Sequence, residues 1–550
     1  MVSRNLAFVV GCAVAQSSGA LGWEPPTQYS VSVLLELPYI DLVEPILVYY
    51  DEDLKLERLD YWHGADTYVF NLTAGENSTS HQIVPTSSDG VKSEATCFSM
   101  TGAAPLSSVF PDVSKFSRVE GTKEVRGVEV DVLELIQPEF DPASGLIGNY
   151  SFYVRHDDGA TPVSFEFVGH NTVTGGHVDE WNFVYSEFLP GPQKAALFEA
   201  PWAKMTCSEL ETDDDDGPTA ARSHALGHQP LEDLAMLHAT GAPRRVAAFR
   251  AYADRYGKTH GDDAHERFAL FHGARRYVNA MNRRHLSYAL ETNHLADWTP
   301  SEKARLRGRK HTPAGSSNRA TKAHGAPADV GAVGDVDWRD EGAVTKVKDQ
   351  GSCGSCWSYG TTGAIEGQHF LKHGKLVELS QQNLMDCSWK EGNNACDGGL
   401  DSNAYDWMLD VNGGKVAEAN SYGSYKNADG YCHSATAGAA IAGYVNVTDG
   451  LAGFNDALAN VGPLSISIDA TPNSFYYYKS GFYYADECKS GLDDLDHTVL
   501  AVGTVVHGGQ KYTIVKNSWS THWGDEGYVY ISQKNNCCGV ATDATYPLIV

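Results

Sequence analysis

The hydrophobic positions of the first 210 residues form a strand-like pattern. Short stretches rich in β-branched and aromatic residues recur, and turn signals such as Asp158-Gly159 and Gly175-Gly176 interrupt them. The clearest stretches are YSVSVLLEL, PILVYYD, TYVFNLT, VEVDVLELI, NYSFYVRH and WNFVYSEF. The pattern predicts an antiparallel β-rich domain over residues 23–210, built as a curved sheet or a partial barrel.

A different spacing begins near residue 240. Hydrophobic residues recur there at intervals of three and four, which is the spacing of one face of an α-helix. The first set is Val246, Phe249, Ala253 and Tyr256, and the second is Phe268, Phe271, Ala274, Val278 and Met281. Residues 240–310 are therefore predicted to contain two amphipathic helices.

The last block, residues 336–550, has a mixed pattern. It predicts a helix that begins at Cys356 and further helices near 380–386 and 401–411. Strand-like runs follow at 464–469, 498–506, 511–516 and 527–532. The expected fold class is α+β.

Two segments of linker-like composition separate these blocks. Residues 211–239 open with the acidic run ETDDDDGP, which is typical of a solvated linker. Residues 311–335 contain PAGSSNRATKAHGAPADVGAVG, a composition that predicts a flexible, protease-sensitive connection.

The first 22 residues have the pattern of a secretory signal peptide. Arg4 precedes an apolar run from Leu6 to Ala15, which is too short to span a membrane, and small residues follow it. No later segment is apolar enough to predict a membrane span. The net charge of −28 argues against nucleic acid or an anionic membrane as a partner, because both require a basic face.

A secretory route makes disulfides and glycosylation expected features. Of the eleven cysteines, ten remain once the signal peptide is removed. Cys97 and Cys207 are the two in the β-rich block, and we expect them to pair. Candidate glycosylation sites are Asn71, Asn77, Asn149 and Asn446.

The stretch DQGSCGSCWSYG, residues 349–360, carries the strongest chemical signal. Cys353 and Cys356 have the spacing of a redox pair, of half a metal site, or of a nucleophile beside an unrelated disulfide. A redox pair normally opens a helix near a βαβ pattern, which is missing, and a zinc site needs two further ligands at matching spacing. The sequence therefore favours a nucleophile and predicts no metal.

A cysteine nucleophile needs a base, a group that orients the base, and a donor for the oxyanion. His497 stands in LDHTVLAVG, Asn517 stands in VKNSWSTHWGDEGYVYI, and Gln350 precedes Cys356 by six residues. With QGSCGSCW, these motifs resemble the papain/cathepsin family of cysteine proteases. The resemblance covers residues 240–550 and implies a two-lobed catalytic domain over 336–550, with a helical lobe and a β-barrel-like lobe. It implies no cofactor.

The resemblance also assigns catalytic roles. Cys356 would form a thiolate at a helix N-terminus, and His497 would pair with it as an imidazolium. Asn517 would orient His497, and Trp519 would shield their hydrogen bond from water. The Gln350 side chain and the Cys356 backbone N–H would form the oxyanion hole.

Disulfide pairing is implied by the same resemblance. Cys353 pairs with Cys396, Cys387 with Cys432, and Cys488 with Cys538. This leaves Cys356 free, as a nucleophile requires, and also leaves Cys537 over. Cys537 could take Cys488 instead, and the sequence leaves that choice open.

The helical block resembles the inhibitory propeptide of these proteases. Asp263, Arg267, Phe271, Val278 and Asn282 keep or mildly substitute the helical propeptide pattern, and Asn293, Leu295 and Asp297 resemble its second motif. The chain is therefore expected to be a zymogen whose residues 240–310 lie in its own cleft. Low pH should loosen the salt bridges of this propeptide.

Substrate contacts follow from the resemblance as well. Gly399 would pair with substrate backbone, and a pocket for the second residue before the scissile bond would be hydrophobic, with some tolerance of Arg or Lys through Asp543. The residues assigned to substrate binding are Gly399, Leu400, Ser467, Leu495, Asp543, Trp519 and Trp523.

The expected activity is that of a cysteine endopeptidase acting on proteins or peptides in the lysosome, an endosomal vacuole or outside the cell. EPPTQYSVSVLLELPYIDLVEPILVYYDED and RLDYWHG resemble the N-terminal part of two-part insect haemocyte cathepsin-like proteases, which implies a β-rich accessory domain that could remain bound after processing. Two alternatives stay open: an exopeptidase with an N-terminal exclusion domain, and an adhesion or signalling protein that uses its β domain.

Overall fold

The structure is a computed structural model. It describes residues 23–40, 42–71, 79–86, 94–101, 108–139, 145–172, 177–198, 205–209, 242–311, 320–326 and 334–550. The signal-peptide region, the whole of the acidic linker and Gly175-Gly176 lie outside these ranges. The described chain divides into two compact units: one holds residues 23–272 apart from 85–94, and the other holds 85–94 with residues 273–550.

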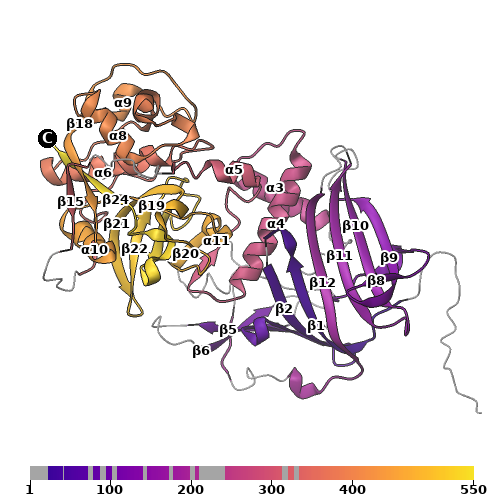
Figure 1. Ribbon diagram of the computed structural model, residues 1–550. Coiled ribbons are helices and arrows are strands. Elements are labelled where there is room, and N and C mark those ends of the chain that lie inside the picture. The colour runs from indigo at the N-terminus through magenta and orange to yellow at the C-terminus, as the bar shows by residue number, and fades with distance from the viewer. Residues whose placement is uncertain are drawn as a thin grey trace, which may run out of the picture. The chain divides into compact units, whose positions relative to one another are not determined.

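Thirteen strands of the described residues form the mostly antiparallel sheet of the first unit (Figure 1). They are β1 Gln28–Leu37, β2 Leu42–Asp51, β3 Leu56–Tyr61, β4 Asp66–Asn71, β5 Thr79–Thr86, β6 Glu94–Thr101, β7 Ser117–Arg118, β8 Lys123–Val125, β9 Val128–Pro138, β10 Leu146–Arg155, β11 Pro162–Asn171, β12 His177–Pro190 and β13 Ser208–Glu209. Their order is β13-β6-β5-β4-β3-β2-β1-β12-β11-β10-β9-β7, with β8 also on β9. The predicted β-rich domain is confirmed.

Alternation of side chains explains why these segments are strands. Along β1, Tyr29, Val31, Val33, Leu35 and Leu37 are buried, and the residues between them are more exposed. Successive side chains of a strand point to opposite faces, so this pattern gives β1 one core face. An aromatic core lies on that face, where the ring centroids of Tyr29 and Phe110 are 5.0 Å apart.

The first unit also contains helix α3 (Ala242–Arg255) and the start of α4 (Ala264–Asn282). The two helices pack through the hydrophobic residues that their spacing predicted: the ring centroids of Phe249 and Phe268 lie 5.7 Å apart, and those of Tyr252 and Phe271 lie 4.5 Å apart. Helix α3 therefore belongs to the same compact unit as the β-rich sheet, although residue 240 was the expected boundary between them.

The second unit contains the remaining elements. Its helices are α5 Pro300–Arg305, α6 Cys356–His373, α7 Gln381–Cys387, α8 Asp401–Asp410, α9 Ala419–Tyr422, α10 Gly450–Asn460 and α11 Asn473–Tyr476. Its strands are β14 Tyr288–Leu290, β15 Lys322–His324, β16 Val336–Asp337, β17 Lys415–Ala417, β18 Ala437–Val447, β19 Leu464–Ile468, β20 Tyr478–Tyr483, β21 His497–His507, β22 Gln510–Lys516, β23 Tyr528–Ser532 and β24 Ala544–Ile549.

Residues 336–550 form a helical lobe and a β lobe (Figure 1). The helical lobe closes over a cluster that includes Trp357, Leu384 and Tyr405, all fully buried. The β lobe is built on the ladder β20-β23-β22-β21-β19-β24-β18. The α+β, two-lobed architecture is thus confirmed.

Two short strands join this sheet from outside the catalytic domain. Strand β14 pairs with β20, with Tyr288 opposite Gly481. Strand β15 pairs in parallel with β18, with Ala323 opposite Asn446. Part of the expected flexible linker, residues 322–324, is therefore an ordered strand, because its backbone completes the edge of a sheet.

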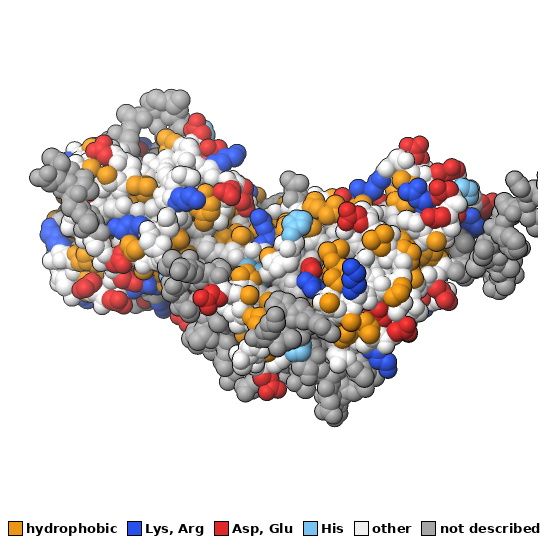
Figure 2. Space-filling view, turned by 90° about the horizontal axis from the view of Figure 1, so that it is seen from below, with side chains coloured by type: hydrophobic (Ala, Val, Ile, Leu, Met, Phe, Trp, Pro, Cys, Tyr) orange, Lys and Arg blue, Asp and Glu red, His pale blue; other side chains and the backbone are white. Residues whose placement is uncertain are grey.

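Figure 2 shows how charged side chains are distributed on one face of the molecule. On the face seen in Figure 2, Lys and Arg side chains are scattered among acidic and hydrophobic ones rather than gathered in one patch. Among the helices that the structure describes, none combines the length and hydrophobicity needed to cross a bilayer.

Candidate active site

Cys356 is the first residue of α6, the helix that runs through the helical lobe. Ser355 precedes it at the N-cap, and Gly374 ends the helix in the left-handed conformation that glycine adopts without strain. The first backbone N–H groups of a helix carry partial positive charge, which favours a thiolate at this position. The Cys356 side chain has no disulfide and is fully buried.

His497 begins β21, and Asn517 follows the end of β22, so the antiparallel pairing of these two strands brings them together. His497 Nε2 lies 2.8 Å from Asn517 Oδ1. Since the amide oxygen accepts, Nε2 carries the proton and Nδ1 is the unprotonated nitrogen of the neutral ring. Nδ1 has no hydrogen-bond partner among the described residues.

Trp519 covers this hydrogen bond. Its ring centroid lies 4.8 Å from that of His497, and its side chain is 1% exposed. Trp523 lies behind it, with ring centroids 5.4 Å apart, and its Nε1 donates to the Phe475 carbonyl at 2.8 Å. Trp519 therefore covers the His497–Asn517 pair, and Trp523 packs behind Trp519 in the core of the lobe.

Burial favours the neutral forms of the Cys356 and His497 side chains. It raises the pKa of the Cys356 thiol to about 11, and it lowers the pKa of the His497 imidazole to about 4. Desolvation disfavours the charged form of each group, and this exceeds the opposing effect of the Asn517 hydrogen bond on His497. At neutral pH the covered site therefore contains a thiol and an imidazole, not an ion pair.

Gln350 is fully buried, and its side-chain amide is hydrogen-bonded on both sides. Its Nε2 donates to the Cys353 carbonyl at 2.8 Å and to the Leu306 carbonyl at 3.0 Å, while its Oε1 accepts from Ser518 Oγ at 2.7 Å. The Ser518 bond fixes the amide orientation. A carbonyl from the segment after α5 thus lies where a substrate carbonyl would have to bind if Gln350 stabilises an oxyanion.

The segment that follows α5, residues 306–310, crosses the site along Gly399. Gly399 N donates to the Gly308 carbonyl at 2.9 Å, and Lys310 N donates to the Gly399 carbonyl at 3.0 Å. Arg309 and Gly399 form a parallel bridge. A side chain at position 308 would clash with the Gly354 backbone, so glycine permits this close approach to the start of α6.

Arg309 fills a pocket beside the bridge. Its side chain is fully buried; Nη2 lies 2.7 Å from Asp543 Oδ2, and Nη1 donates to the Leu495 carbonyl at 3.2 Å. Ser467 Oγ also donates to Asp543 Oδ2, at 3.1 Å. Of the residues assigned to substrate binding, Gly399, Leu495, Ser467 and Asp543 are thus gathered around Arg309.

Leu400 adjoins these residues in the chain and is 7% exposed, and its backbone N–H donates to Asn393 Oδ1 at 2.8 Å.

The residues on either side of this segment are also fixed by local and β-lobe contacts. Thr299 and Glu302 form a capping box that starts α5. Beyond the helix, Arg307 pairs with Asp496, the residue before His497. Earlier in the chain, Asn293 Nδ2 donates to the Tyr476 carbonyl at 2.8 Å. The proposed propeptide residues therefore contact the β lobe directly.

The sequence predicted that residues 240–310 lie in the cleft, but it did not single out residues 306–310 as the ones that reach Gln350 and Asp543. Leu306, Arg307 and Arg309 lie in ARLRGRK, a basic run that directly follows the second propeptide motif. The available signal was the position of this basic run, between the second propeptide motif and the linker at residues 311–335. Its fit to Gln350 and Asp543 depends on contacts with residues far away in the chain.

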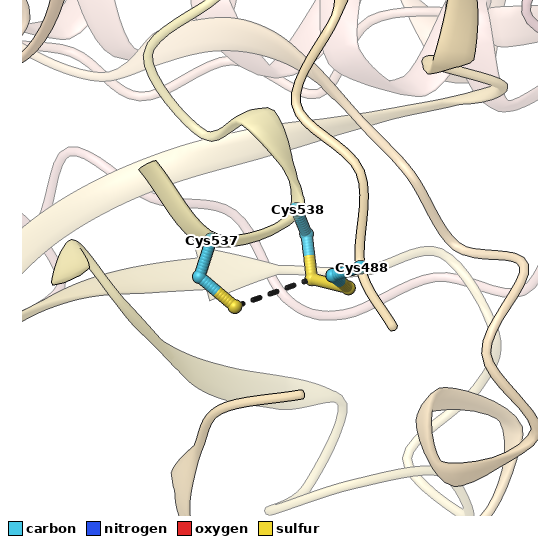
Figure 3. Close-up of side chains that lie close together, drawn as sticks. All are labelled: Cys488, Cys537 and Cys538. Atoms are coloured by element: carbon cyan, nitrogen blue, oxygen red, sulfur yellow. Dashed lines mark hydrogen bonds between the residues drawn. A yellow bond between two sulfur atoms is a disulfide. The ribbon is translucent and has the colours of Figure 1, made fainter. Parts of the chain in front are cut away.

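Four disulfides form among the described residues: Cys97–Cys207, Cys353–Cys396, Cys387–Cys432 and Cys488–Cys538. These are the expected pairs, and Cys538, not Cys537, takes Cys488. Cys537 remains a buried thiol with its Sγ 3.7 Å from Cys538 Sγ (Figure 3). Cys488 Sγ and Cys538 Sγ are bonded to each other, so Cys488, Cys537 and Cys538 do not offer three thiolates to a metal.

Three of the four candidate glycosylation sites lie in described strands. Asn71 is exposed at the end of β4, whereas Asn149 and Asn446 are half-buried within β10 and β18. Asn77 lies outside the described residues.

Comparisons with known proteins identify both parts of the second half of the chain. Residues 333–548 match the papain family of cysteine proteases, and residues 249–302 match the cathepsin propeptide inhibitor domain. Cathepsin L of Sarcophaga peregrina is 42% identical over 317 residues, which are 55% of this chain and 92% of that protein. The chain belongs to the papain family of cysteine proteases.

Further relatives agree. Digestive cysteine proteinase 2 of Homarus americanus is 40% identical over 313 residues, 54% of this chain and 93% of that protein. The structure of digestive procathepsin L 3 from the larval midgut of Tenebrio molitor aligns with a TM-score of 0.50 at 31% identity, covering 55% of this chain and 99% of that one. This papain-family member is a cathepsin L-like cysteine peptidase made as a proenzyme, and the segment in its cleft directly follows α5, where the match to the propeptide inhibitor domain ends.

Proposed function

We propose that the mature protein is an endopeptidase whose catalytic group is Cys356, with His497, Asn517 and Gln350 in support. The observation that carries the proposal is the Leu306 carbonyl on Gln350 Nε2, at the start of α6 and across from the His497–Asn517 hydrogen bond. This arrangement imitates a bound substrate carbonyl. Departure of the propeptide would admit water and remove the burial that keeps both groups neutral.

In the open site, His497 takes the Cys356 proton and the two form a thiolate–imidazolium pair. The thiolate attacks the carbonyl carbon of the substrate, and Gln350 Nε2 with the Cys356 backbone N–H binds the resulting oxyanion. The C–N bond breaks as the His497 imidazolium protonates the leaving amine. Water, deprotonated by His497, then hydrolyses the thioester and restores the thiolate.

An active-site thiol probe tests the catalytic assignment. An epoxide inhibitor at pH 5 should label the processed protein at Cys356, and Cys356→Ala should remove the label. Cys537→Ser is the matched control, since Cys537 is the other free thiol of the described residues and should contribute no label. Labelling that persists in Cys356→Ala would overturn the assignment.

We further propose that the pocket around Asp543 prefers hydrophobic side chains at the second residue before the scissile bond and also accepts Arg or Lys. The buried Leu495 supports the first part, and Arg309 seated on Asp543 supports the second. Turnover of matched peptides with Leu or Arg at that position tests it. Asp543→Ala should reduce turnover of the Arg peptide selectively; equal turnover by wild type and variant would refute the Arg part.

Endopeptidase activity is preferred over exopeptidase activity because the segment between Cys387 and Cys432 has no long His-bearing insertion and residues 240–310 contain no cysteine. Products from a long peptide distinguish the two activities. Internal cuts support the endopeptidase, whereas stepwise removal of dipeptides would support the exopeptidase.

For the β-rich domain we propose a role in holding the propeptide. Arg245 of α3 is 6% exposed and donates to Glu139 and, at 2.8 Å, to the Tyr150 hydroxyl. Tyr150 in turn donates to Glu139 Oε1 at 2.8 Å. Glu139 and Tyr150 are also buried, so the three side chains form a closed polar cluster between α3 and the sheet.

This cluster supports an N-terminal fragment that keeps α3 after a cut in residues 311–335. Proteolysis of the full chain at pH 5, followed by N-terminal sequencing and gel filtration, tests the proposal. We expect the β-rich domain and α3 in one fragment. A first cut near residue 240 that releases α3 from the sheet would contradict it.

The proposed route is secretory, with removal of residues 1–22 and delivery to a lysosome, an endosomal vacuole or the exterior. Four disulfides among the described residues fit an oxidising compartment. N-terminal sequencing of the protein from culture medium or vesicles tests the route. Glycosidase treatment tests the sequons, with exposed Asn71 the strongest candidate.

A further inference from the structure

A second carboxylate lies behind the pocket that Arg309 fills. Asp401 is the first residue of α8 and is 6% exposed. Its Oδ2 accepts from Thr545 Oγ1 at 2.7 Å, and its Oδ1 accepts from the Ser402 backbone N–H at 2.8 Å. The catalytic proposal does not use this buried acid.

The sheet places Asp401 and Asp543 beside each other. Strands β19 and β24 pair Ser465 with Thr545, and Ser467 N donates to the Asp543 carbonyl at 3.0 Å. Residues two apart on a strand share a face and lie about 6.6 Å apart. Asp401 accepts a hydrogen bond from Thr545, and Asp543 accepts one from Ser467, so the two acids lie beside neighbouring positions of this ladder.

The electrostatics of Asp401 agree with this placement. Burial raises its pKa, and the neighbouring Asp543 charge raises it further, while the hydrogen bond from Thr545 acts in the opposite direction. Of the other titratable groups that face the two acids in the described structure, Arg309 comes from the propeptide, and Tyr405 of α8 is held neutral by a pKa well above its ordinary value.

Arg309 shows which ligand suits these acids. A guanidinium is seated on Asp543 with its side chain fully buried, in the proenzyme itself. A cation at this position is attracted by both carboxylates when both are ionised, and by only one carboxylate when the pair retains a proton.

We propose that Asp401 is a positioning residue for specificity, which through Asp543 strengthens the binding of a substrate Arg or Lys and makes that preference depend on pH. The inference rests on the proposed function, because it takes the Arg309 pocket to be the substrate pocket. As pH rises, Asp401 ionises and the pocket gains a second negative charge. Preference then shifts from hydrophobic toward basic side chains.

The test compares kcat/KM for two peptides that differ only in Leu or Arg at the second residue before the scissile bond, between pH 4 and 7.5. For wild type the Arg-to-Leu ratio should rise with pH. Asp401→Asn should lower the ratio at the upper end by about three- to thirtyfold, mainly through KM of the Arg peptide, and should flatten its pH dependence. Asp397→Asn, an exposed acid nearby in the chain, is the control and should change neither.

A second variant guards against a misfolded Asp401→Asn. Thr545→Val keeps the acid but removes a hydrogen bond that stabilises its charged form, so the rise of the ratio should move to higher pH. An unchanged ratio and pH profile in both variants, or an equal loss for both peptides, would overturn the inference. Failure of Asp543→Asn to reduce the Arg preference would instead refute the proposed pocket itself.

Discussion

Nη2 of Arg309 lies 2.7 Å from Oδ2 of Asp543, and no part of the Arg309 side chain is exposed. The propeptide therefore does more than cover Cys356: it inserts a side chain into a pocket with a complementary charge. The same segment places the Leu306 carbonyl on Gln350, so the autoinhibited site is filled at two positions that the proposed mechanism assigns to substrate.

Replacing Arg309 should loosen the propeptide. Arg309→Met leaves Asp543 without its cation and should cost about 1.5–3 kcal/mol of docking, since hydrogen bonds to charged groups contribute about that much. The labelling rate of Cys356 in the uncleaved chain measures the open fraction and should rise by tenfold or more. The exposed Arg305→Met is the matched control. Equal labelling rates in both variants would contradict this prediction.

Gln350 should matter for rate and not only for propeptide binding. Gln350→Ala should lower kcat by about 10²–10³, or about 2.7–4 kcal/mol, as loss of one oxyanion donor does in comparable sites. Steady-state kinetics of the processed enzyme checks this, with KM expected to change little. A loss confined to KM would show that Gln350 binds the ground state instead.

Acid should destabilise the proenzyme through His497. Its folded pKa of about 4 lies below the ordinary 6.5, so the unfolded chain takes up a proton first and stability falls as pH drops from about 6.5 to 4. The loss should approach about 3 kcal/mol. Denaturant unfolding in a Cys356→Ala background, which prevents self-digestion, measures it.

The component due to His497 should vanish in His497→Gln and persist in the exposed control His522→Gln. A pH dependence that is identical in all three proteins would exclude His497 as its source.

The cluster between α3 and the β-rich sheet should be sensitive to one substitution. Arg245→Met leaves Glu139 buried without its cation, and breaking such pairs costs about 3–5 kcal/mol. Thermal unfolding of the full chain should show a lower first transition. Arg244→Met, at the exposed neighbouring residue, is the control and should not shift that transition. An unshifted first transition in Arg245→Met would contradict the prediction that the cluster holds α3.

Local pattern was sufficient for several long elements of this fold, although β18 and α10 were not predicted. The side-chain alternation of β1 and the three- and four-residue spacing of α3 and α4 are local properties, so the sequence carries them directly. Strands β14 and β15 were not predicted. Each has three residues and exists because a distant strand edge, β20 or β18, offers hydrogen bonds to its backbone.

The candidate site likewise contains residues whose placement the sequence predicted and residues whose placement it did not predict. Cys356, His497, Asn517 and Gln350 stand in recognisable motifs, and the structure brings His497 to Asn517 as the resemblance implied. Trp523 shares a motif with Trp519, yet the geometry gives the two different places, which a motif cannot distinguish.

Asp401 is an acidic residue whose place beside the candidate site could not be predicted from the sequence. It looks like an ordinary helix-start residue in the sequence, and only the pairing of β19 with β24 places it beside Asp543.

The most direct test of the account is the reactivity of Cys356 before and after propeptide removal. The full-length proenzyme should resist an epoxide thiol probe at pH 7, because a buried thiol with a pKa of about 11 contains almost no thiolate. After processing, the same probe should label Cys356 rapidly, and His497→Gln should slow that labelling. Equal labelling of Cys356 in the intact and the processed chain would contradict the account.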